Sequence, residues 1–187
     1  MSVTTMLMAA SVIAQGPAPT ISTGRDGEIW SHAQARIEQQ MDVWFESGDY
    51  PKVIQLLKVE RDLTPHDYEV ATNLGWMQEN VEDYPSAIKT YERYIADNPN
   101  SNDAELPLAQ LYFRQKKYAL VPPLLEKTVK RTPPPHGNVW RILAHSYERT
   151  NRLKESERVW LTYLKVDPND APAKVNLARV QKKLGSK

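Results

Sequence analysis

Hydrophobic residues recur three and four positions apart along most of the chain. Leu108, Leu111 and Tyr112 are one example, and Val159 with Tyr163 is another. This spacing places apolar side chains on one face of an α-helix, whereas a half-buried strand would alternate apolar and polar residues. Short polar segments separate the helical stretches. The pattern therefore predicts an all-α chain made of successive amphipathic helices.

The helical pattern also repeats with a fixed period. Pro65, Pro99, Pro133 and Pro168 follow one another at intervals of 34, 34 and 35 residues. A period of this length is typical of helical repeat arrays, in which each unit packs against its neighbours. A small residue at position 8 would let paired helices approach closely, and an aromatic residue at position 24 would fill the space beside it. The small residues are Gly75, Ala109, Ala144 and Ala178, with Met41 as the departure in the first segment, and the aromatic residues are Tyr91 and Trp160.

The landmarks within each period resemble the tetratricopeptide repeat (TPR), whose pattern is W-x2-L-G-x2-Y, then A-x3-F, then P. The segment from Gly137 has Trp140, Leu143, Ala144, Tyr147, Ser156, Trp160 and Pro168, and the segment from Tyr68 has Leu74, Gly75, Tyr84, Ala87, Tyr91 and Pro99. The resemblance implies a right-handed helical-hairpin solenoid, a TPR-like superhelix, within residues 28–187. We expect about four repeats over residues 34–67, 68–101, 102–136 and 137–170, followed by a C-terminal capping helix over 171–187.

Prolines single out the third repeat as the irregular one. Pro51 and Pro85 occupy the same repeat position, where proline suits the first turn of a second helix. Pro122 and Pro123 stand later in the third repeat, which predicts that its second helix begins nearly one turn late. Either a shortened helix or a hinge would follow, and proline alone is sufficient for the shortened helix.

The first 27 residues differ in composition from the repeats. Residues 6–14 are an apolar run of nine, too short to span a bilayer, and Val12 with Ala14 supplies a small-residue cleavage signal before Gln15. However, no Lys or Arg precedes Arg25, although signal peptides normally start with basic residues. We therefore expect residues 1–27 to be either a signal peptide with a flexible leader, which would export the protein to the periplasm or outside the cell, or a disordered apolar tail of a cytoplasmic protein.

Composition excludes several function classes. The 187 residues are 41% hydrophobic and 25% charged, with a net charge of +1 that argues against general nucleic-acid binding. The absence of cysteine excludes disulfides and thiolate metal sites. The four histidines have no partners at metal-ligand or catalytic-triad spacing, and the sequence contains neither a phosphate-binding loop nor a nucleophile elbow. We therefore expect no catalytic residues, no metal, no cofactor and no transmembrane segment in the mature chain.

The TPR resemblance also suggests a binding surface. In TPR proteins, positions 2, 5, 9, 12 and 13 of the first helix generally line a concave groove. Carried over to this chain, they give as candidate partner-binding residues Glu38, Asp42, Phe45, Glu46, Trp76, Glu79, Phe113, Arg114, Arg141, His145, Arg149 and Arg179, with Glu148, Lys182 and Lys183 beside them. This groove would be acidic at one end and basic at the other, and its aromatic residues are harder to explain by solubility than its charges are.

The expected function is therefore non-catalytic binding of a peptide or protein segment, as an adaptor or assembly factor, because concave solenoid surfaces usually bind partners. Two alternatives remain open. The chain could be a structural subunit that self-associates or assembles in the envelope through its convex face. It could also be an accessory subunit of an enzyme encoded elsewhere.

Overall fold

The computed structural model describes residues 24–186, and in that range every regular element is a helix. The order is α1 (Arg25–Glu46), α2 (Tyr50–Leu63), α3 (Tyr68–Asn80), α4 (Tyr84–Asp97), α5 (Leu106–Arg114), the 3₁₀ helix η1 (Tyr118–Leu120), α6 (Val121–Thr128), α7 (Gly137–Arg149), α8 (Leu153–Val166) and α9 (Ala171–Gly185). The apolar run over residues 6–14 and its proposed cleavage site lie outside the described residues. Helix α1 already begins at Arg25, within the last residues of the expected leader.

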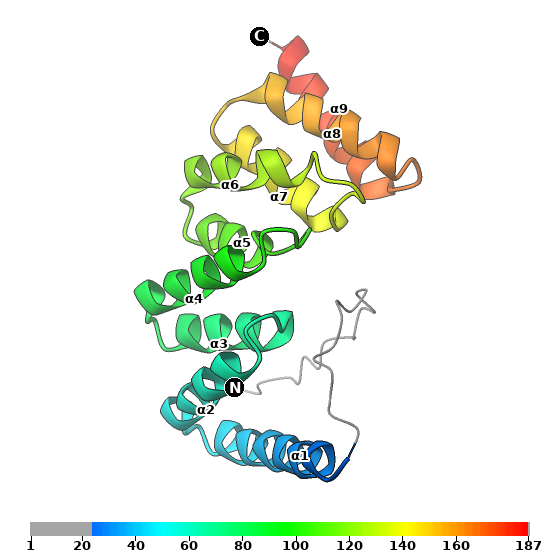
Figure 1. Ribbon diagram of the computed structural model, residues 1–187. Coiled ribbons are helices and arrows are strands. Elements are labelled where there is room, and N and C mark those ends of the chain that lie inside the picture. The colour runs from blue at the N-terminus through cyan, green and yellow to red at the C-terminus, as the bar shows by residue number, and fades with distance from the viewer. Residues whose placement is uncertain (1–23, 187) are drawn as a thin grey trace.

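The helices stack as consecutive antiparallel hairpins (Figure 1). Helices that follow one another along the chain pack together, as α1 does on α2, α3 on α4, α7 on α8 and α8 on α9. The all-α, hairpin-by-hairpin architecture predicted from the sequence is confirmed. Such a stack is stabilised by contacts between neighbours, so surface residues on successive hairpins form continuous stripes along it.

The turn inside each of the four hairpins contains one residue with a positive φ angle at the same repeat position. Gly48, Glu82, Lys116 and Asn151 all stand at position 15 of their repeats, and their φ angles are 76°, 61°, 60° and 59°. Only Gly48 adopts this left-handed conformation without a steric penalty from a Cβ atom. The recurrence of one conformation at one position shows that the four hairpins share a common turn geometry.

The small and aromatic repeat positions meet in the core. A Cβ atom built on Gly75 would overlap the ring of Tyr91, so only glycine allows α3 and α4 their observed approach. Tyr91 and Trp160 are 3% and 0% exposed, and Trp160 lies in one apolar cluster with Ala144. The predicted pairing of positions 8 and 24 is therefore confirmed in these two repeats.

Apolar packing is unequal along the stack. The largest cluster runs continuously from Leu106 on α5 to Val180 on α9. The cluster nearest α1 is much smaller and is centred on α2 and α3, with Met41 and Trp44 of α1 at its margin. Ile29, in the first turns of α1, is 60% exposed. The C-terminal hairpins therefore have the more extensive core.

The third repeat departs from the others as its prolines predict. Helices α2 and α4 begin at Tyr50 and Tyr84, but at the equivalent Tyr118 the chain forms η1, and α6 starts only at Val121. Helix α6 has 8 residues, whereas α4 has 14. Arg131 holds the following loop, because its guanidinium donates to Glu105 at 2.7 and 2.9 Å. The structure thus contains the shortened helix.

Candidate functional site

The candidate binding residues lie on the first helix of each hairpin, α1, α3, α5 and α7, and on α9. Neighbouring first helices meet through one recurring register, in which position 12 of a repeat faces positions 9 and 13 of the next. By this register Phe45 stacks on Trp76, Glu79 pairs with Arg114, and Glu148 binds Arg179 and Lys183, while Phe113 lines a pocket with His145 and Arg149. Most of the predicted residues are therefore brought together in pairs one repeat apart.

An aromatic cluster, defined as Phe45, Tyr50 and Trp76, lies at the α1 end of this surface. The ring centroids of Phe45 and Trp76 are 6.4 Å apart with an interplanar angle of 30°, and those of Phe45 and Tyr50 are 5.8 Å apart. The three residues are 44%, 37% and 48% exposed, respectively. Three adjacent, half-exposed aromatic side chains are unusual on a solvated surface and mark a candidate contact site.

Acidic side chains follow the same face of α1. Glu38, Asp42 and Glu46 are each four residues apart, so they lie in one row on the helix, and all three are exposed. None of them forms an ion pair with any residue in the range 24–186. The acidic end predicted from the sequence thus carries three uncompensated charges.

In the middle of the surface the charges are compensated internally. Glu79 forms an ion pair with Arg114 and accepts a hydrogen bond of 2.8 Å from the hydroxyl of Tyr91. Burial, followed by the neighbouring Glu79 carboxylate, raises the pKa of Tyr91. Glu79 is only 9% exposed as a side chain. This pair therefore links α3 to α5 and adds little net charge to the surface.

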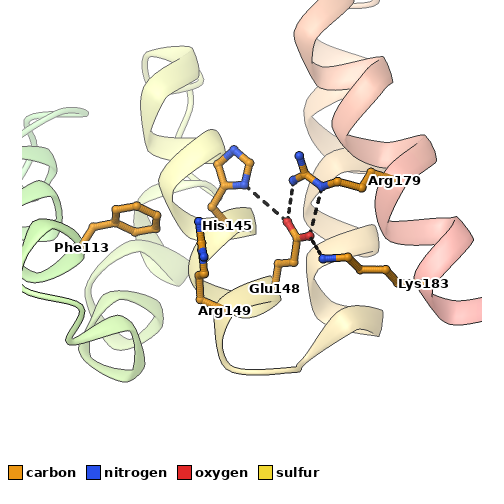
Figure 2. A pocket seen from close by; sticks show the side chains of 6 residues that line it. All are labelled: Phe113, His145, Glu148, Arg149, Arg179 and Lys183. Atoms are coloured by element: carbon orange, nitrogen blue, oxygen red, sulfur yellow. Dashed lines mark hydrogen bonds and ion pairs between the residues drawn. The ribbon is translucent and has the colours of Figure 1, made fainter. Parts of the chain in front are cut away.

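A basic pocket of about 650 Å³ lies at the opposite end, between α5, α7 and α9. It is lined by Phe113, His145, Glu148, Arg149, Arg179 and Lys183 (Figure 2). Arg179 donates two hydrogen bonds to Glu148, at 2.6 and 3.1 Å, and Lys183 donates one at 2.7 Å. Although burial raises the pKa of Glu148, these hydrogen bonds outweigh it and hold the pKa at about 2. Glu148 is therefore a fixed internal counter-ion.

The pocket keeps a net positive charge despite Glu148. Burial foremost, and then the nearby Arg179, lowers the pKa of His145, which disfavours the charged form of its ring. Arg149, Arg179 and Lys183 carry three positive charges against the one negative charge of Glu148, which leaves +2. The guanidinium of Arg149 lies 6.0 Å from the ring centroid of Tyr118. The pocket is thus suited to an acidic group beside apolar atoms.

Comparison with known proteins agrees with this architecture. Residues 80–161 match the family described as anaphase-promoting complex, cyclosome, subunit 3. Among solved structures, the protein titled MamA AMB-1 is 23% identical over 83% of this chain and 84% of its own, with a TM-score of 0.59. MamA from Desulfovibrio magneticus RS-1 is 18% identical over 81% and 85%, with a TM-score of 0.61. This chain is a TPR-like protein. No curated protein sequence matches it significantly.

TPR domains are generally protein–protein interaction modules and are typically non-catalytic. The matched range begins at the last residue of α3 and ends within α8, so it includes the short α6 of this TPR-like protein. Within residues 24–186 no three His, Asp or Glu side chains are arranged to hold a metal ion. No helix in the described part of the chain combines the length and apolar character that a membrane span requires.

Arg141 differs from the other candidate residues of the TPR-like protein because it is bound into the C-terminal packing. Its guanidinium pairs with Asp170, which also accepts a hydrogen bond of 2.7 Å from Tyr163 and caps α9 through the backbone N–H of Ala173. Arg141 does not line the basic pocket. Arg141, one of the basic residues expected in the groove, therefore helps to hold α9 against α7 and α8.

Two aromatic residues of these sites were not among the sequence candidates. Tyr50 completes the aromatic cluster, and Tyr118 lies 5.0 Å from Phe113 and beneath Arg149. Both stand at position 17 of their repeats, as does Tyr84. The recurrence of tyrosine at position 17 of the first three repeats was the signal that could have identified them.

Proposed function

We propose that this TPR-like protein is a non-catalytic adaptor or assembly factor that binds an extended protein segment along α1, α3, α5, α7 and α9. The observation that carries the proposal is the aromatic cluster. Phe45, Tyr50 and Trp76 remain half exposed and belong to none of the apolar core clusters in the described part of the chain. Aromatic side chains in such positions are typical anchors of a protein interface.

The distribution of charge gives the bound segment a direction. Glu38, Asp42 and Glu46 leave the α1 end acidic, whereas the basic pocket carries +2. A segment with basic residues at one end and acidic residues at the other would lie with its basic part on α1. Complementary charges of this kind mainly set orientation and association rate, so binding weakens as salt is added. Glu79, Arg114 and Arg141 contribute little to this direction because their charges are paired within the chain.

Site-specific photo-crosslinking in the native organism tests the proposal. A photoreactive phenylalanine derivative replaces Trp76 or Phe113 in one set of variants, and exposed residues of the second helices, Val59 or Leu161, in a matched set. We expect a protein adduct from Trp76 and Phe113 and none from Val59 and Leu161. Adducts from the second set alone would contradict the proposal.

A second candidate function is supported by apolar residues on the second helices. Val59 and Leu63 on α2 are each 54% exposed, and Leu161 and Val166 on α8 are each 45% exposed. These residues favour a structural subunit that associates through the opposite face of the stack. In the same experiment, an adduct between Leu161 and a second copy of the chain would support that function.

A further inference from the structure

We infer that the aromatic cluster, together with Asp42 and Glu46, is a binding site for an arginine side chain of the protein partner. The inference deepens the proposed function, on which it rests, because it assigns a residue type to the α1 end of the bound segment. The acids and the rings form one patch, since Asp42 lies three residues before Phe45 and four residues before Glu46 on α1.

Within residues 24–186 no cation lies over the rings of the cluster, whereas several other rings have one. In the described part of the chain, Lys52 lies over Trp44 at 5.8 Å, Arg149 over Tyr118 at 6.0 Å and Arg152 over Tyr147 at 4.5 Å. Among the described residues no such partner lies over Phe45, Tyr50 or Trp76, although all three are half exposed and Asp42 lies three residues before Phe45 on α1. An aromatic face attracts cations, and tryptophan does so most strongly. The patch therefore presents unoccupied ring faces to a positive group.

The carboxylates in the row Glu38, Asp42 and Glu46 on α1 destabilise the protein when no partner is bound. Glu38, Asp42 and Glu46 repel one another at i,i+4 spacing, and no ion pair within residues 24–186 relieves them. Glu46 is also the last residue of α1, whose final turn contains no basic residue. A negative charge at a helix C-terminus opposes the helix dipole, whereas a cation there is favoured. A bound cation would weaken both the repulsion between the carboxylates and the unfavourable interaction of Glu46 with the helix dipole.

Arginine fits this patch better than lysine does. Its planar guanidinium can stack on an aromatic ring and, in the same pose, donate two parallel hydrogen bonds to a carboxylate. The lysine ammonium is a strongly hydrated point charge that cannot stack. Since Asp42 and Glu46 lie near Phe45 on α1 and Trp76 of α3 stacks on Phe45, the guanidinium can use both parts of the patch.

Nuclear magnetic resonance of the full chain, observed at the indole N–H of Trp76, tests the inference. The probes are three blocked peptides, acetyl-Ser-Gly-X-Gly-Ser-amide, in which X is arginine, lysine or citrulline, the neutral analogue of arginine. We expect a saturable shift of the Trp76 signal with the arginine peptide, binding about threefold weaker with lysine, and no saturable shift with citrulline.

Two double variants identify which carboxylates contribute to binding of the arginine peptide. We expect Asp42→Asn with Glu46→Gln to weaken binding of the arginine peptide about tenfold, since the charge-assisted hydrogen bonds are lost. Glu82→Gln with Glu92→Gln removes two exposed acids elsewhere and should change binding less than about twofold. Circular dichroism confirms that both double variants remain folded.

Several results would overturn the inference: no saturable shift at Trp76, an equal response to citrulline, or equal losses in the two double variants. If the arginine peptide fails while photo-crosslinks from Trp76 and Phe113 still capture a protein, the proposed function stands and the arginine site is wrong. If the crosslinks fail as well, the proposed function fails with it.

Discussion

Truncation of Trp160 tests the repeat packing, because this side chain fills the space beside position 8 in the fourth hairpin. Trp160 is 0% exposed and its indole N–H has no hydrogen-bond partner among the described residues, so packing is what Trp160→Ala removes. Truncation of a fully buried tryptophan costs about 3–5 kcal/mol. With an m-value of about 2 kcal/mol/M in urea, the midpoint of unfolding should fall by about 1.5–2.5 M.

Trp76→Ala is the matched control, since it is the same substitution at a residue that is 48% exposed. We expect it to cost about 1–2 kcal/mol, because the half-exposed Trp76 side chain buries less apolar area than Trp160 does. Urea unfolding of both variants and the parent, followed by circular dichroism, measures the difference. Equal midpoints for the two variants, or an unchanged midpoint for Trp160→Ala, would refute the assignment of position 24 as a core position.

Three further predictions concern local features of the stack. Gly75→Ala should lower the stability by about 1–3 kcal/mol, because the added methyl group overlaps the Tyr91 ring; an unchanged thermal midpoint would show that α3 and α4 separate without cost. Glu82→Gly should raise the stability by about 0.5–1 kcal/mol, because φ at Glu82 is 61°, and a lower thermal midpoint would contradict this. The pKa of Glu148 is lowered to about 2, so its stabilising contribution is complete above the unfolded value of about 4.3 and is lost as pH falls towards 2. Urea unfolding from pH 6 to pH 2 should therefore show a smaller loss for Glu148→Gln than for the parent, and equal losses would contradict the assignment.

The fold was accessible from the sequence because its main constraints are local and periodic. Gly75 and Tyr91 are sixteen residues apart in one repeat, and their packing follows from the size of each side chain. Pro122 and Pro123 likewise dictate the late start of α6, since proline is suited to the first turn of a helix. The hairpin architecture depends mainly on such short-range rules.

The charge of the candidate site was less accessible because the repeat positions identify single charged residues and do not show which of them pair. Glu148 stands one repeat before Arg179 and Lys183, and Glu79 stands one repeat before Arg114, so part of the apparent charge is neutralised within the chain. These pairs form because position 12 of one repeat faces positions 9 and 13 of the next. This register depends on how far one hairpin is displaced along its neighbour. That displacement is set by packing between hairpins, which the repeat pattern alone does not specify.

The central claim is that the first helices bind one extended segment in one direction, and the most direct measurement uses the segment recovered from the Trp76 and Phe113 crosslinks. Its affinity, as a synthetic peptide, is compared with that of a peptide of the same composition whose basic and acidic ends are exchanged. The account predicts that the native order binds at least about tenfold more tightly at low salt and that added salt reduces the difference. Equal affinity of the two peptides for the folded protein would contradict a directed groove.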